Sequence, residues 1–189
     1  LRGSIAIGHV RYSKSGTPTI RDAEPFRVQH GDLDFSIAHN GALVNSKTLR
    51  KRLEKQGAIF HTNTDSEIFA HLIISELEKS GDLLGAVKAA CKEVSGAYCL
   101  LILANDKLIA VRDPLGMKPL TLGILKDTNT WVVASETCAF DLLEAEVMRS
   151  VAPGEIVVID ANGLTEERFA ESTHRRQCIF ELVYFARPD

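Results

Sequence analysis

The chain has 189 residues, 45% of them hydrophobic and 25% charged, a composition typical of one globular domain with a substantial core. The formal net charge of −3 argues against bulk attraction to nucleic acid or to an anionic membrane. No apolar run approaches the roughly 20 residues that a membrane-spanning helix needs. The opening residues, LRGS, lack a methionine and the pattern of a signal peptide, so we expect an internal fragment or a processed product.

The cysteines give no metal-binding pattern. They are far apart and irregularly spaced, without a C-x-x-C pair, at Cys91, Cys99, Cys138 and Cys178. We therefore expect no metal and no cofactor in this segment. Cys99 lies in an apolar run and Cys91 on an expected helix, which favours buried free thiols. Few cysteines without a disulfide framework suit a reducing cytoplasm, which is the location we expect.

The first half of the chain predicts two strands and then three helices. Residues 4–10 are small, branched and uncharged, which predicts a buried strand, and residues 33–38 predict another. Between them, residues 13–25 are rich in Ser, Gly, Thr and Pro, as in a loop. Amphipathic helices with capping residues near their starts are expected at 46–56, 65–79 and 82–94.

After Gly96 the pattern changes to short strands. Three strand pairs are expected, at 97–104 with 108–112, at 119–125 with 130–134, and at 155–160 with 164–169. A short helix is expected at 135–143. This order lacks the alternating βα rhythm of a doubly wound sheet. It favours an α+β fold with two packed, mostly antiparallel sheets and helices outside.

Three short polar motifs carry the chemistry of this sequence. They supply a cation, an amide next to a glycine, and a carboxylate. Such groups could hold an α-amino acid by its carboxylate and ammonium while polarising an amide carbonyl. The attacking group is not evident. The motifs are His9-Val10-Arg11-Tyr12, His39-Asn40-Gly41 and Asn63-Thr64-Asp65-Ser66-Glu67.

Each motif also has a simpler interpretation. Arg11 fits a structural salt bridge as well as a carboxylate-binding fork. The dipeptide Asn40-Gly41 follows a strand, and Asn-Gly is the commonest sequence of a tight turn. Asp65 opens an expected helix and fits a capping role. Taken singly, the structural interpretation is favoured for each motif: a salt bridge or a surface position for Arg11, the turn for Asn40-Gly41 and the cap for Asp65.

Other polar residues have structural interpretations. Residues 112–119 contain Asp-Pro-x-Gly, which is turn chemistry, and a phosphate-binding role for Lys118 has little support. His9, His39 and His61 lack the spacing of a zinc site. We expect the first two of these histidines to satisfy buried backbone groups.

Jointly and in this order, the motifs resemble the glutaminase half of the amidophosphoribosyltransferases, over the whole chain. The last of the matching segments is long and distinctive, and it is similar to the family's bridge into a phosphoribosyltransferase domain. We therefore expect a type 2 glutamine amidotransferase domain at residues 1–177 and the start of that bridge at 178–189. The matching segments are residues 8–13, 38–41, 64–67, 112–114, 135–136, 153–155 and 178–189.

The resemblance implies a fold and a mechanism. Members of this family are N-terminal-nucleophile hydrolases with a four-layer αββα sandwich, in which an N-terminal cysteine attacks the side-chain amide of glutamine. By resemblance, Asn40 and the Gly41 N–H form the oxyanion hole, Arg11 binds the α-carboxylate, Asp65 binds the α-ammonium, and Tyr12 lies in a gating loop. The ammonia then attacks phosphoribosyl pyrophosphate to give 5-phosphoribosylamine for purine synthesis.

The sequence departs from the family in three respects. The strand with the N-terminal cysteine is expected upstream of Leu1, and none of the four cysteines can replace it, so we expect no hydrolysis by this chain. Lys14 stands where members usually have Thr. We expect the transferase domain, with its Mg²⁺ and phosphoribosyl pyrophosphate sites, to be absent from this chain. Cys178 matches an iron–sulfur ligand of some members, although others have this cysteine without a cluster.

Two alternatives stay open. One is the glutaminase domain of a relative such as glucosamine-6-phosphate synthase or asparagine synthetase, against which residues 178–189 argue. The other is a noncatalytic glutamine-binding or regulatory module. In every case glutamine is the expected ligand, with neither nucleic acid nor a membrane as a partner, and we expect the full-length parent to form a homo-oligomer.

Overall fold

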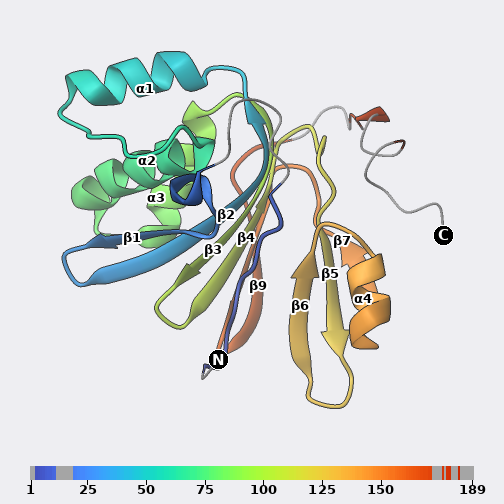
Figure 1. The fold of residues 1–189 in the computed structure, drawn as a ribbon. Coiled ribbons are helices and arrows are strands. Elements are labelled where there is room, and N and C mark those ends of the chain that lie inside the picture. The colour runs from blue at the N-terminus through green and yellow to red at the C-terminus, as the bar shows by residue number, and fades with distance from the viewer. Residues whose placement is uncertain (1–2, 12–18, 172–175, 177, 180–182, 184–189) are drawn as a thin grey trace.

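Two antiparallel sheets face each other, with helices on the outer side of each (Figure 1). The computed structural model describes residues 3–11, 19–171, 176, 178–179 and 183. The larger sheet has six strands in the order β1-β2-β3-β4-β8-β9, and the smaller has three in the order β6-β5-β7. This arrangement confirms the expected α+β sandwich of four layers.

The larger sheet is built around strands that are buried on both faces. The apolar runs of β3, β4 and β8 occupy its centre, where side chains on either face leave water. All of its neighbouring strands are antiparallel. Its strands are β1 Phe26–His30, β2 Leu33–Leu43, β3 Gly96–Ala104, β4 Lys107–Arg112, β8 Glu155–Asp160 and β9 Gly163–Arg168.

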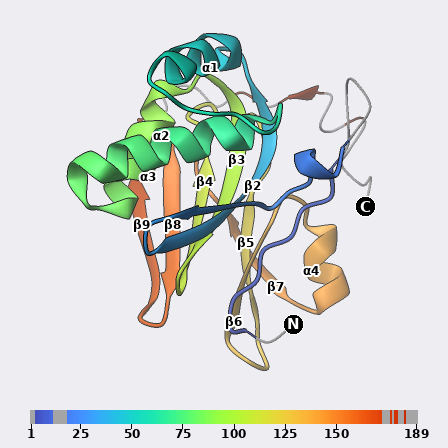
Figure 2. The same ribbon diagram turned by 60° about the vertical axis from the view of Figure 1, so that its left-hand side comes forward.

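Three helices cover the outer face of this sheet (Figure 2). The buried side of α2 carries Phe69, whose ring packs edge-on against Tyr98 of β3 with centroids 5.3 Å apart. The side chain of Asp82 caps α3 by accepting hydrogen bonds from the Leu84 and Gly85 N–H groups. The helices are α1 Ser46–Lys55, α2 Asp65–Ser80 and α3 Leu83–Glu93, close to the predicted ranges.

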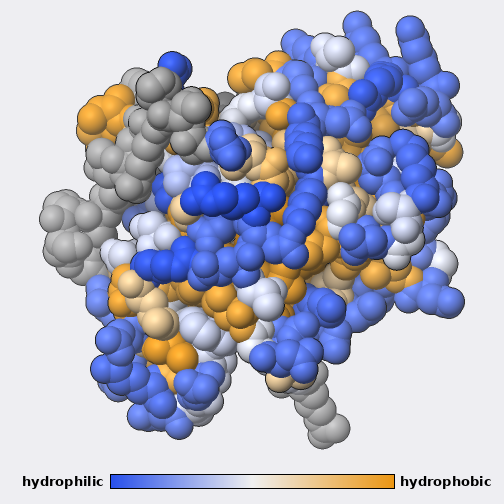
Figure 3. All heavy atoms as spheres, turned by 180° about the vertical axis from the view of Figure 1, so that it is seen from behind, coloured by the Kyte–Doolittle hydropathy of each residue, from blue (hydrophilic) through white to orange (hydrophobic). Residues whose placement is uncertain are grey.

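The smaller sheet consists of β5 Thr121–Leu125, β6 Thr130–Ala134 and β7 Glu146–Ser150, and α4 Cys138–Leu143 lies outside it. Phe140 of α4 is fully buried against this sheet. A second apolar cluster fills the space between the two sheets. Seen from behind, most of the surface is hydrophilic, with hydrophobic residues in small areas between (Figure 3).

Residues 4–10 do not form the predicted strand. This segment lies in no β-ladder among the described residues, and Val10 is 97% exposed. Ile5 and Ile7 nevertheless pack against the cluster between the sheets. The alternating apolar side chains are therefore used for packing, but a strand also needs a hydrogen-bonded neighbour.

Three further differences concern strands. Both β1 and β7 went unpredicted, and β2 continues through residues 39–43 where a turn was expected.

Among the described residues, no helix is long and apolar enough to cross a bilayer. The domain boundary at residue 177 stays a prediction, since residue 177 and most of 178–189 lie outside the described part. The N-terminal strand expected upstream and the cytoplasmic location also stay predictions.

Candidate functional site

One edge of β2 is open beside the site motifs. The strand β1 pairs with Leu33–Ile37 of β2, so within the described part of the chain residues 39–43 have a neighbouring strand, β3, on one side alone. On the open side, the His39 N–H donates to Glu24 Oε2 at 2.7 Å and the Leu43 N–H donates to Asp65 Oδ2 at 2.9 Å. Since backbone N–H groups alternate between the two edges of a strand, the Gly41 N–H faces the same open edge, between these carboxylates.

Gly41 is required by a close approach of strands, not by a turn. Its φ is +147°, and a Cβ there would lie 2.0 Å from the Ala97 carbonyl oxygen of β3. Gly96 has the same relation to β2, with φ at +146° and a Cβ position 2.3 Å from the Ala42 oxygen. The turn interpretation of Asn40-Gly41 is therefore wrong, because both residues lie inside the β2–β3 ladder.

The side chain of Asn40 points toward the second sheet. Its Nδ2 lies 3.5 Å from Oγ of Ser135, which follows β6. Its cross-strand neighbour Cys99 belongs to the cluster between the sheets. At this length the contact with Ser135 is weak, so the amide keeps donor capacity for another acceptor.

Asp65 does not cap its helix, which corrects that interpretation. Thr64 is the N-cap of α2 and makes no side-chain capping bond, while the Asp65 carboxylate reaches across to β2. Burial raises the pKa of Asp65, and the Leu43 N–H together with the charges of Arg50 and Arg11 partly oppose this rise. Among the described residues, the carboxylate is thus fixed by one oxygen, which leaves the other for a cation.

Arg11 lies close to a carboxylate that the sequence did not reveal. Its Nη1 is 3.8 Å from Glu24 Oε1, so the salt-bridge interpretation of Arg11 is confirmed. Glu24 is one of two acidic residues, with Asp22, in a loop rich in small and polar residues, and nothing in its sequence context marks it. Tyr12 and Lys14 lie outside the described residues, so both expectations stay predictions.

His39 is buried as a neutral ring. Its centroid lies 5.7 Å from that of Phe69, and its Nε2 has no hydrogen-bond partner in the described part of the chain. Burial lowers the pKa of His39 to about 3, and the nearby positive charges of His9, Arg11 and Lys118 act in the same direction. The imidazole therefore stays uncharged at neutral pH.

One ring nitrogen of each of the first two histidines lies buried without a hydrogen bond among the described residues, namely His39 Nε2 and His9 Nδ1. The expectation that these histidines satisfy backbone groups therefore stays a prediction for their other ring nitrogens. His61 lies apart, with Nδ1 3.4 Å from Glu67. Within the described ranges, no three His, Cys, Asp or Glu side chains are grouped so as to hold a metal ion.

We expect His39 to make the protein less stable in mild acid. The unfolded chain takes up this proton near pH 6.5, whereas the folded chain resists it until about pH 3. Stability from this residue is therefore lost as the pH falls from 6.5 towards 3, at about 1.4 kcal/mol per pH unit in the middle of that window. The free energy of unfolding, measured in urea at pH 7, 6 and 5, should decline less steeply with falling pH for His39→Leu than for the original chain. Equal slopes would contradict the burial of a neutral His39.

Glu67 fixes the loop before α2 through hydrogen bonds. Its buried carboxylate accepts hydrogen bonds from the His61 N–H, the Thr62 N–H and the Thr62 hydroxyl, each at 2.7 Å. Burial alone would raise the pKa of Glu67, but these hydrogen bonds lower it overall. This network fixes the loop that leads into α2 and so helps to direct Asp65.

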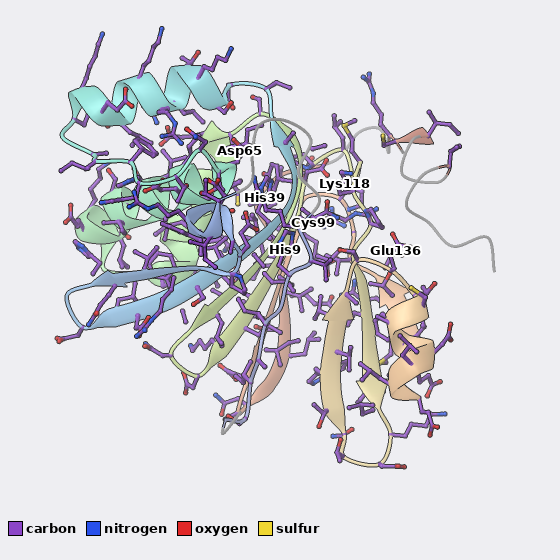
Figure 4. The ribbon with its side chains drawn as sticks, viewed as in Figure 1. His9, His39, Asp65, Cys99, Lys118 and Glu136 are labelled. Carbon is purple, nitrogen blue, oxygen red and sulfur yellow. The ribbon has the colours of Figure 1, made fainter. Side chains whose placement is uncertain are left out.

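The turn after β4 is structural, as predicted. Arg112 is buried and donates to the carbonyl oxygens of Lys118, Val151 and Gly116 at 2.8, 2.6 and 3.0 Å. Asp113 accepts backbone N–H groups of the same turn. Figure 4 shows Lys118 and Cys99 between His39 of the larger sheet and Glu136 near the smaller one. The turn thereby connects the two sheets, since Arg112 of β4 reaches the carbonyl oxygen of Val151 just after β7.

The cysteines are free, as expected. Cys91 and Cys99 are buried, and burial raises the pKa of Cys91 to about 12. Cys138 and Cys178 are half-buried. An iron–sulfur cluster takes several cysteine ligands, and the described residues bring no such group together around Cys178. Its role as a ligand therefore stays a prediction.

Known proteins resemble the chain over its full length. A family model described as a glutamine amidotransferase domain matches residues 9–141. Amidophosphoribosyltransferase 1, chloroplastic, of Arabidopsis thaliana is 42% identical over 189 residues, which are 100% of this chain and 33% of that protein. The amidophosphoribosyltransferase of Methanocaldococcus jannaschii is 42% identical over 204 residues, covering 100% of this chain and 43% of that protein.

Solved structures agree. The structure described as the allosteric regulatory enzyme of purine biosynthesis has a TM-score of 0.88 and 40% identity, over 96% of this chain and 38% of that one. The structure of glutamine phosphoribosylpyrophosphate amidotransferase from B. subtilis, complexed with ADP and GMP, has a TM-score of 0.86 and 39% identity, again over 96% of this chain and 38% of that one. The chain thus spans well under half the length of these relatives. The resemblance found in the sequence is confirmed, and the chain belongs to the glutamine amidotransferase domain family.

Proposed function

We propose that this chain is the glutaminase portion of an amidophosphoribosyltransferase and that it binds glutamine at the open edge of β2. The observation that carries this proposal is the Gly41 N–H, which faces that edge between the carboxylates of Asp65 and Glu24. Arg11 lies beside the second of these carboxylates. The whole-chain identity of 42% with an amidophosphoribosyltransferase supports the assignment.

Each end of glutamine has a complementary group in this site. The guanidinium of Arg11 binds the α-carboxylate, and the free oxygen of Asp65 binds the α-ammonium. The side-chain carbonyl accepts from the Gly41 N–H and the Asn40 amide, which would stabilise a developing oxyanion. The opposite charges of Arg11 and Asp65 select a zwitterionic amino acid. Tyr12 lies outside the described residues and keeps its expected gating role as a prediction.

Two of the four cysteines are poorly suited to act as the nucleophile. Cys91 and Cys99 are buried within apolar clusters, and the high pKa of Cys91 keeps it a thiol. In this proposal, residues 1–189 bind glutamine without hydrolysing it. In the parent protein, an N-terminal cysteine would release ammonia. That ammonia would displace pyrophosphate from phosphoribosyl pyrophosphate in a Mg²⁺-dependent second domain, giving 5-phosphoribosylamine for purine synthesis.

Calorimetry with glutamine tests the proposal. The original chain should bind glutamine, and Asp65→Asn and Arg11→Gln should each weaken binding about 10- to 100-fold, because each removes a charge-assisted contact. Arg27→Gln is a matched control, since Arg27 forms an exposed pair with Asp34 on β1 and β2. It should bind like the original chain.

Three outcomes would count against parts of this account. Absence of binding by a demonstrably folded chain would refute the proposed site. Release of glutamate would refute the absence of a nucleophile. Glutamine binding that persists in both site variants would place the ligand elsewhere. A noncatalytic module predicts the same binding, but its parent protein would release no ammonia from glutamine.

A further inference from the structure

Glu24 is a buried carboxylate at a meeting point of the fold. Its side chain is 2% exposed. Its Oε2 accepts the His39 N–H of β2 at 2.7 Å, and its Oε1 accepts the Ser66 hydroxyl of α2 at 2.6 Å. Both donors belong to regular elements that are packed into the main core. The carboxylate is therefore held in a fixed place by a rigid frame.

The same carboxylate faces a segment that has little other anchorage. Arg11 Nη1 lies 3.8 Å from Oε1, and His9 Nδ1 lies 3.7 Å from Oε2. Residues 3–11 join no β-ladder in the described part of the chain, and Val10 is almost fully exposed. Apolar packing of Ile5 and Ile7 fixes the start of this segment but does not reach Arg11.

We propose that Glu24 is a positioning residue, which docks the segment carrying His9 and Arg11 onto β2 and α2 and thereby directs the Arg11 guanidinium at the open edge of β2. The identity of what Arg11 binds there rests on the proposed function. The separation of 3.8 Å marks an ion pair that does not use the paired donors of the guanidinium fork. With respect to the described residues, those donors stay available to bind a carboxylate of a ligand in two parallel hydrogen bonds.

Glu24→Gln separates docking from general support of the fold. The carboxamide retains one oxygen, which can keep a hydrogen bond to the frame. Its NH₂ group would face a donor, and the attraction to Arg11 is lost with the charge. A matched control is Glu67→Gln, since Glu67 is also a buried carboxylate and hydrogen-bonds only to the neighbouring loop at His61 and Thr62 among the described residues.

Hydrogen exchange by mass spectrometry tests the docking directly. In Glu24→Gln, amides of residues 3–11 should exchange faster by about tenfold, as expected for the loss of one charge-assisted contact. In Glu67→Gln, the same amides should exchange at the original rate, with faster exchange at residues 61–62 instead. Unchanged exchange of residues 3–11 in Glu24→Gln would overturn the proposal.

Ligand binding tests the effect on Arg11. Glu24→Gln should weaken the binding of glutamine about tenfold. It should leave the affinity for γ-aminobutyramide, which lacks the α-carboxylate, unchanged. Equal weakening of both compounds would mean a general loss of structure and would overturn a positioning role. NMR titration can follow the weaker ligand.

Two safeguards keep the test decisive. If Glu24→Gln does not fold, Arg11→Gln takes its place, because it removes the charge that pairs with Glu24 and leaves the hydrogen bonds of Glu24 to His39 and Ser66 in place. Faster exchange at residues 9–11 supports the proposal, and unchanged exchange overturns it. If the folded original chain binds neither compound, the proposed function fails. The exchange measurement then still decides whether Glu24 docks the segment.

Discussion

Replacing Gly41 by alanine should lower the free energy of unfolding by about 2–5 kcal/mol and abolish glutamine binding. A Cβ at this position would meet the Ala97 carbonyl oxygen at 2.0 Å, and the backbone has a φ of +147°. The strands β2 and β3 would have to separate, which moves the Gly41 N–H away from the open edge. Denaturant unfolding followed by circular dichroism gives the first effect, and calorimetry the second.

Gly31→Ala is the matched control for this prediction. Gly31 also has a positive φ, at +56°, but a Cβ there meets nothing within 4 Å. Its replacement should cost only the conformational penalty, about 1 kcal/mol, and leave glutamine binding intact. If Gly41→Ala were as mild as Gly31→Ala, the close approach of β2 and β3 would be refuted.

Replacing Arg112 by methionine should lower the free energy of unfolding by about 3–5 kcal/mol. Arg112 is 2% exposed and donates to three carbonyl oxygens, which would be left without these donors in the interior. One of these oxygens belongs to Val151, just beyond the smaller sheet. We therefore expect the contact between the two sheets to loosen, which thermal unfolding followed by circular dichroism would report as a lower midpoint.

Arg27→Met separates this effect from the loss of any arginine. Arg27 pairs with Asp34 at the surface of β1 and β2, where water screens the interaction. Its replacement should leave the unfolding midpoint close to that of the original chain. An Arg112→Met protein that melts at the original temperature would show that the three carbonyl oxygens find other donors.

The centre of the fold could be predicted from the sequence because its elements are buried strongly and regularly. The apolar runs of β3, β4 and β8 mark strands that are covered on both faces, and the 3.6-residue spacing in α2 marks one buried side. Both signals are local. The order of strands in each sheet, by contrast, depends on contacts between segments that are far apart in sequence.

The missed strands are edge strands. Both β1 and β7 lie at the border of their sheets, with residues FRVQH and EVMRS. An edge strand has one neighbour and partial burial, so its hydrophobic pattern is weak. Residues 4–10 show the opposite error, since an apolar alternation predicted a strand where packing occurs without a ladder.

The site shows a similar division. Arg11 and Asp65 stood out because charged residues bordered apolar elements. The local sequence Asn40-Gly41 favours a turn, which is why a turn is predicted there. The actual role of Gly41, in the close approach of two strands, depends on Ala97 in a strand that is distant in sequence. Glu24 gave no signal at all, because its burial arises only when β2, α2 and the segment of Arg11 meet around it.

The most direct test of the account is an NMR titration of the isotope-labelled chain with glutamine. We predict saturable shifts at the Gly41 backbone amide and the Asn40 side-chain amide, with no shift at the exposed side of α1. Saturable shifts that leave Gly41 and Asn40 unmoved would place glutamine elsewhere and would contradict a site at the open edge of β2.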